Sequence, residues 1–131
     1  MSATVTLIPG DGIGPEVTAS ARQVVDASGA SVQWERLDAG MSSLEHTGEA
    51  IPEGVYESVM RNRVALKGSM GNTFGGDFRV RRTVRLPDGR VEEHSYPGPT
   101  IALRGELGLF ANVRPVRSFD GIASRYRNVD W

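Results

Sequence analysis

Short apolar runs alternate with helical stretches along the first half of the chain, and this order constrains the fold more than any other feature. Three runs have the length and composition of strands: residues 5–8, 32–37 and 64–66. Apolar residues keep helical spacing after Pro15 and again after Pro52, and residues 39–46 are predicted to hold a short helix. A strand, helix, strand, helix, strand order is typical of parallel α/β structure. We therefore predict an α/β fold with a mainly parallel sheet flanked by helices.

A different pattern begins near position 78. Arg alternates with apolar residues up to Leu86, the Pro-Asp-Gly sequence of residues 87–89 is a strong turn signal, and a polar run continues to Tyr96. This pattern predicts an antiparallel β-hairpin inserted at about residues 78–99. Val80 and Val84 share one face of its first strand because side chains alternate between the two faces of a strand.

The last quarter of the chain is predicted to return to regular structure. Residues 101–109 have a helical pattern, and residues 110–116 are predicted to form a last strand, near an edge because of Pro115. No linker composition interrupts the chain, so residues 1–131 are expected to form a single domain.

Composition excludes several classes of protein. The formal net charge is -1, which gives no overall field for nucleic acid. The chain has no Cys, so disulfides and thiolate metal sites are excluded, and His46 and His94 lie too far apart for a local metal motif. No segment is long and apolar enough to span a bilayer, and the N-terminus does not have the pattern of a signal peptide. We therefore expect a cytoplasmic protein with no nucleic-acid or membrane partner.

The glycine-rich stretch from Ile8 to Glu16 lies between a predicted strand and a predicted helix. A dinucleotide-binding fingerprint needs the spacing G-x-G-x-x-G, and the position of its third Gly is Pro15 here. The loop can still approach an anion at the start of a helix. From its chemistry alone, ligand contact and a purely structural tight turn remain equally open.

The same stretch, Ile8 to Glu16, resembles the opening loop of the isocitrate, isopropylmalate, homoisocitrate and tartrate dehydrogenases. Four further segments resemble this family in the same order: residues 47–53, 65–68, 102–116 and 125–130. The resemblance covers nearly all of the chain except the predicted hairpin. The chain is therefore identified as a truncated member of these β-decarboxylating dehydrogenases, similar to their N-terminal domain.

The resemblance implies a set of site residues. The family oxidises a 2-hydroxy acid with NAD or NADP and removes its β-carboxylate with help from Mg or Mn. Arg104 and Arg114 match two of the three arginines that clamp the substrate carboxylates, and Thr100 falls where the family has a substrate-contacting Asn. Ile13 and Asn72 match cofactor-side positions. Surface ion pairing is the alternative role for the two arginines.

The chain also departs from the family pattern. A substrate-contacting Ser of the family is replaced by Val80, and about nineteen residues, Arg81 to Pro99, interrupt the substrate motif. The third arginine, the catalytic tyrosine and lysine, and the metal-binding aspartates would lie beyond Trp131. We therefore expect neither catalytic residues nor a metal site in this chain, and no cofactor bound to it alone.

Three functions follow from these observations. The first is a diverged protein that is not catalytic alone and binds a small carboxylate or a protein partner. The second is an NAD(P)-dependent oxidative decarboxylation of a 2-hydroxy acid, performed when a second chain supplies the missing half. The third, unrelated chemistry on the same fold, lacks a nucleophile–base pair to support it. We also expect a homo-oligomer, a dimer, with the hairpin in the contact; packing of the hairpin on the chain's own core is an equal alternative.

Overall fold

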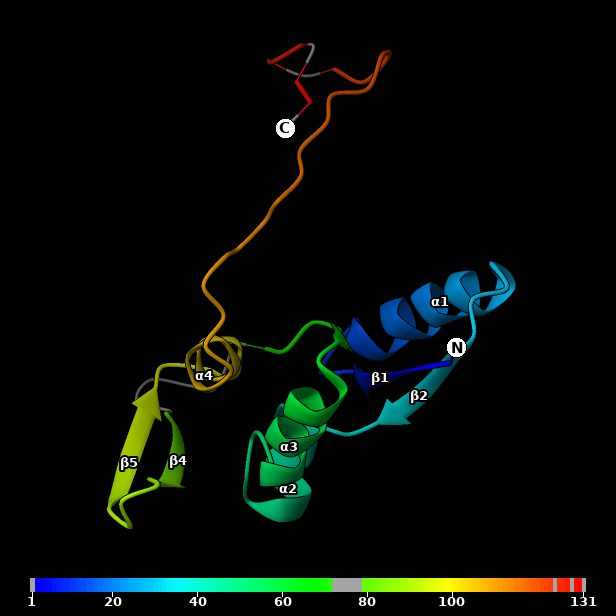
Figure 1. The fold of residues 1–131 in the computed structure, drawn as a ribbon. Coiled ribbons are helices and arrows are strands. Elements are labelled where there is room, and N and C mark those ends of the chain that lie inside the picture. Colours follow the sequence, from blue (N-terminus) through cyan, green and yellow to red (C-terminus); the bar gives the residue numbers. More distant parts are fainter. Residues whose placement is uncertain (1, 72–78, 124, 128, 131) are drawn as a thin grey trace.

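The computed structural model describes residues 2–71, 79–123, 125–127 and 129–130. Its architecture is α/β, as the order of elements predicts (Figure 1). In chain order the elements are β1 (Ala3–Ile8), α1 (Gly14–Ala27), β2 (Val32–Arg36), α2 (Met41–Thr47), α3 (Glu53–Asn62), β3 (Ala65–Lys67), β4 (Val80–Arg85), β5 (Val91–Tyr96) and α4 (Pro99–Glu106). Within these residues, no helix is long and apolar enough to cross a membrane.

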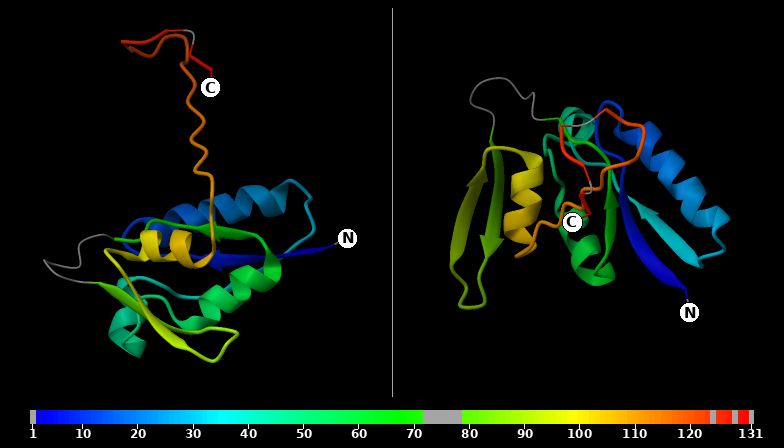
Figure 2. Two further views of the ribbon diagram at one scale, coloured as in Figure 1. Left: turned by 60° about the vertical axis from the view of Figure 1, so that its left-hand side comes forward. Right: turned by 90° about the horizontal axis from the view of Figure 1, so that it is seen from above.

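The main sheet has three strands in the order β2-β1-β3, and both pairings are parallel. Thr6 lies opposite Ala65 and Leu7 opposite Leu66, which confirms the predicted parallel pairing of these two segments. Strand β1 is central, and its last three residues are buried because the sheet is covered on both faces. Helix α1 lies on one side of the sheet and α3 on the other, as right-handed crossovers in opposite directions require (Figure 2).

The inserted hairpin forms as predicted and packs on the chain's own core. Strands β4 and β5 pair antiparallel, with Val80 opposite Tyr96 and Arg85 opposite Val91. Val80 is buried in the same apolar cluster as Ile8 of β1 and Val55 of α3. The sequence left open whether the hairpin packs on the chain's own core or on a second copy, and its inner face packs on the core. Phe78, at its predicted start, lies outside the described residues.

The predicted strand at residues 110–116 is wrong. This segment forms no strand, and Figure 1 shows it as an extended arm that leads away from α4. Phe110 is fully exposed and Val113 nearly so. A strand needs a neighbour for its backbone N–H and C=O groups, and the part of the chain that the structure describes provides none for this arm. Beyond the arm, Arg117 and Asp130 form an isolated antiparallel β-bridge that brings the two ends of the terminal turn together.

A polar network joins the sheet to α3. The Glu35 carboxylate on β2 accepts hydrogen bonds from Asn62 Nδ2 at 2.7 Å, Ser58 Oγ at 2.9 Å and Arg61 Nη2 at 2.5 Å. Ser58 also bonds the fully buried Thr6 hydroxyl of β1 at 2.7 Å. These donors, Asn62 first, then Arg61 and Ser58, lower the pKa of Glu35 from 4.5 to about 2.

We predict that Glu35→Gln removes a stabilisation that depends on pH. Because the pKa of Glu35 is lowered from 4.5 to about 2, its contribution is present above pH 4.5 and is lost as the pH falls towards 2. Urea unfolding should therefore show a difference between wild type and variant that is largest near neutral pH and shrinks in acid. Asp38→Asn, which breaks an exposed pair with Arg36, is the matched control and should change little. A Glu35→Gln difference that does not vary with pH would contradict this account.

Candidate functional site

Two loops meet at the carboxyl ends of β1 and β3. Residues 9–13 follow β1 and residues 68–71 follow β3. Their backbones are hydrogen-bonded: Asp11 N donates to Ser69 O at 2.6 Å, and Gly68 N donates to Ile8 O at 2.8 Å. In open parallel sheets this edge is where ligands bind.

The glycines of the first loop are required by this close approach. Gly10 has φ +74°, and a Cβ there would lie 2.0 Å from Ser69 O. A Cβ on Gly14 would lie 2.3 Å from Pro9 O, and one on Gly68 would lie 2.1 Å from the same oxygen. Gly12 differs, because a Cβ there would meet no atom within 4 Å. Close approach therefore requires glycine at positions 10 and 14, whereas at position 12 only the positive φ of +58° favours it.

Asp11 holds the loops together, a role that the sequence analysis missed. Its carboxylate accepts hydrogen bonds from Met41 N at 2.8 Å and from Gly71 N at 3.1 Å. It thus satisfies one of the first backbone amides of α2, where a negative charge is favourable. The only signal available was an acidic residue between two glycines after a strand.

A cavity of about 330 Å³ lies between β3 and α4. Its apolar lining includes Ile8, Val59 and Leu103, and its polar lining consists of Thr100 and three cations: Arg63, Lys67 and Arg104. Thr100 and Arg104 lie one turn apart on α4, so they face the same side. The structure therefore brings together two of the residues that the family resemblance singled out.

Among the described residues, the cations of the cavity have no ion-pair partner. Within the described residues, none of the three forms an ion pair, and Lys67 Nζ donates only to the carbonyl of Gly68, at 2.8 Å. Burial lowers the pKa of Lys67, and the nearby charge of Arg104 lowers it further, whereas Asp11 raises it. Positive charge therefore accumulates at this position, and no carboxylate among the described residues forms an ion pair with it.

The other predicted site residues do not join this cavity. Arg114 lies on the exposed arm, away from α4, and does not line the cavity that contains Arg104. Ile13 precedes α1 with 69% of its surface exposed. Asn72 lies outside the described residues. Val80 is in the core, where a side chain cannot contact a ligand in the cavity.

The described residues do not fit the family's metal or its dinucleotide. They contain no group of three His, Asp or Glu side chains that could hold a cation. At the start of α1, Gly14 N donates to Asp11 O at 2.8 Å and Pro15 has no N–H, so few backbone donors remain for a phosphate.

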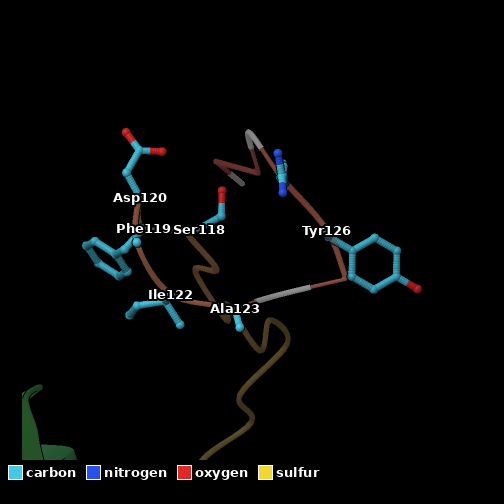
Figure 3. Close-up of a pocket in the computed structure, with 8 residues that line it drawn as sticks. Ser118, Phe119, Asp120, Ile122, Ala123 and Tyr126 are labelled. Carbon is cyan, nitrogen blue, oxygen red and sulfur yellow. The ribbon is translucent and has the colours of Figure 1, made fainter.

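A larger hollow, about 580 Å³, lies in the terminal turn and is lined by residues between Ser118 and Arg127. Figure 3 shows its labelled side chains spread around one loop, with Phe119, Asp120 and Tyr126 pointing outwards. Because one exposed turn forms this hollow without any helix or strand, it lacks the rigid walls that a binding site needs. We therefore take the cavity between β3 and α4 as the candidate site.

Comparison with known sequences decides the family. The sequence model described as isocitrate/isopropylmalate dehydrogenase matches residues 4–131. The chain belongs to the isocitrate/isopropylmalate dehydrogenase family. It is 36% identical over 127 residues to isocitrate dehydrogenase [NAD] catalytic subunit 5, mitochondrial, of Arabidopsis thaliana, covering 97% of this chain and 29% of the relative. It is 35% identical to the chloroplastic 3-isopropylmalate dehydrogenase of Solanum tuberosum, covering 95% of this chain and 30% of that protein.

A solved structure agrees with this assignment. The chain superposes on isocitrate dehydrogenase from Methylococcus capsulatus with a TM-score of 0.75 and 34% identity, covering 98% of this chain and 32% of that one. The chain therefore spans less than a third of the length of these family members. Their names include both NAD- and NADP-dependent isocitrate dehydrogenases, and several are mitochondrial.

We predict that Gly10→Ala destabilises this dehydrogenase-like fold by about 3 kcal/mol, because the added methyl group adds a collision with Ser69 O to the cost of a positive φ. Gly12→Ala is the matched control. It has φ +58° and open space, so only the backbone cost of about 1 kcal/mol should remain. Urea unfolding of both variants measures the difference. Equal losses would show that the approach of the two loops is not what requires glycine.

Proposed function

We propose that this chain binds a small carboxylate in the cavity between β3 and α4, and that it does not catalyse turnover alone. One observation carries the proposal: Thr100, Arg104, Lys67 and Arg63 line the same cavity, and no described carboxylate pairs with the cations. Neighbouring positive charges repel each other and are costly to desolvate. An anion that enters the cavity would relieve both costs.

The lining favours a particular chemical class of ligand. A guanidinium such as that of Arg104 binds a carboxylate through two parallel hydrogen bonds. Thr100 offers a hydroxyl that can bond a second polar group of the ligand. The apolar part of the lining, which includes Leu103 and Leu107, suits a short hydrocarbon portion. A di- or tricarboxylic 2-hydroxy acid combines these features, and the names of the relatives refer to isocitrate and 3-isopropylmalate.

The arrangement supports binding better than catalysis. Arg114, the second arginine of the resemblance, lies on the arm, so Arg104 would hold a ligand from one side only. Catalytic stabilisation requires donors that surround the developing charge in a site closed to water. The described residues also lack a metal-binding group that could act as a Lewis acid.

We predict that Arg104→Ala weakens carboxylate binding by about tenfold or more, because a charge-assisted hydrogen bond is lost. Calorimetry with malate, isocitrate and 3-isopropylmalate measures the affinity. Arg22→Ala, which removes an exposed arginine of α1 that pairs with Asp26, is the charge-matched control and should bind as wild type. Arg114→Ala should also leave the affinity within about twofold, since Arg114 does not line the cavity. Unchanged binding in an Arg104→Ala/Arg114→Ala double variant would overturn the proposal.

A second candidate function is supported by the arm. Leu109, Phe110, Val113 and Val116 are all exposed, as are Phe119 and Ile122 beyond them. A run of exposed apolar residues of this kind marks a surface that another protein surface covers. A different chain that supplies the missing half would then bring Arg114 to a complete site for NAD(P)-dependent oxidative decarboxylation. Relatives of this chain are named as subunits of isocitrate dehydrogenase.

We predict that the chain forms a dimer and that Phe110→Ser/Val113→Ser shifts it to monomer, because these two side chains would lose apolar contact area. Light scattering across a concentration series measures the state. Val91→Ser, at an exposed apolar position on the hairpin, tests whether the hairpin also contributes to the contact. A strictly monomeric wild type at high concentration would contradict self-association.

A further inference from the structure

Helix α4 has two different neighbours on opposite sides. Thr100 and Arg104 line the cavity, whereas Glu106, two residues after Arg104, contacts the hairpin through a side chain that is only 4% exposed. Residues two positions apart on an α-helix point in nearly opposite directions. The hairpin therefore holds the same short helix that carries the cavity's polar residues.

Three donors of the hairpin converge on the Glu106 carboxylate. The Arg82 guanidinium donates to Oε2, while His94 Nδ1 at 2.6 Å and the Tyr96 hydroxyl at 2.8 Å share Oε1. Both hairpin strands contribute, since Arg82 lies on β4 and the other two residues lie on β5. The Tyr96 ring also lies against the helix backbone, because a Cβ on Gly105 would be only 2.8 Å from its Cε1.

Arg82 extends this contact to α3. Its Nε donates to Glu53 Oε2 at 2.9 Å, and its guanidinium carbon lies 4.1 Å from the centre of the Tyr56 ring. Tyr56 and Glu53 both belong to α3, which covers the sheet. Arg82 therefore links α4 to α3 through hydrogen bonds to Glu106 and Glu53.

The charges of this cluster come closer to balance when His94 carries a proton. Arg82 faces two carboxylates, Glu106 of α4 and Glu53 of α3, and cannot neutralise both. The other titratable groups that face His94 or Arg82 are Tyr56 on α3, and Glu92 and Tyr96 on β5, with Glu92 Oε2 3.6 Å from His94 Nε2. The hydrogen bond to Glu106 raises the pKa of His94 above 6.5, so the positive charge of His94 is lost only as the pH rises through this raised pKa.

We propose that Glu106 is a positioning residue for the carboxylate site: by fixing α4 against the inserted hairpin, it sets where Thr100 and Arg104 stand in the cavity. A helix of eight residues is not stable by itself, so its place depends on such contacts. This inference rests on the proposed carboxylate binding. It gives the insertion, which interrupts the substrate motif, a function in that binding.

The first test compares Glu106→Gln with Glu93→Gln, an equal change of charge on the outward face of β5. Calorimetry with malate near neutral pH should show an affinity about tenfold lower for Glu106→Gln, because a displaced Arg104 loses one charge-assisted contact with the ligand. The affinity of Glu93→Gln should be unchanged. Hydrogen exchange of the α4 amides, measured without ligand, should be faster in Glu106→Gln only. A folded Glu106→Gln protein with wild-type affinity and wild-type exchange of α4 would overturn the proposal.

The second test is the pH profile, which a purely structural role would not change. Wild-type affinity for malate should fall as the pH rises from about 6 to 9, and His94→Gln should remove the part of this fall that comes from His94. Any slope that remains in His94→Gln comes from groups other than His94. If Glu106→Gln does not fold, this profile decides, and identical slopes in wild type and His94→Gln would overturn the proposal. If wild type does not bind malate, the carboxylate proposal fails, and exchange of the α4 amides at low and high pH still decides the role of Glu106.

Discussion

The contact on which the rest of the structure depends is the approach of two backbones at the ends of β1 and β3. Gly10 on the first loop, Gly14 at the start of α1 and Gly68 on the second loop leave no room for a side chain, and the amide of Asp11 donates to Ser69 O at 2.6 Å. This contact fixes where β3 ends. The cavity follows from it, because Lys67 is the last residue of β3 and α4 covers the same edge.

The second constraint acts from the opposite side of α4. An eight-residue helix is held by an apolar contact through Ala102 and by the Glu106 carboxylate, which receives hydrogen bonds from both strands of the hairpin. The cavity and its positive charges are therefore supplied by β3, α4 and their neighbours. The inserted hairpin holds α4, the helix that carries Thr100 and Arg104.

Much of the fold could be predicted from the sequence because it depends on local periodicity. The strand and helix patterns up to residue 68 and the turn at residues 87–89 required no knowledge of distant contacts. Arg82 was harder to place. Arg82 shares the inner face of β4 with Val80 and Val84. An arginine there is acceptable only because the Glu53 and Glu106 carboxylates accept its hydrogen bonds. Asp11 raised the same difficulty, since its partners lie 30 and 60 residues away. The prediction of a strand in the arm failed for the opposite reason. Residues 110–116 have a strand-like composition but no neighbouring strand among the described residues.

The central claim is that the isolated chain holds a carboxylate from one side and does not form a closed dehydrogenase site. The most direct measurement is an NAD(P)H absorbance assay of the purified chain with Mg²⁺ or Mn²⁺, either cofactor, and isocitrate or 3-isopropylmalate. The account predicts no rate above background under conditions in which calorimetry detects binding of the same acid. Clear formation of NAD(P)H that Arg104→Ala abolishes would contradict it.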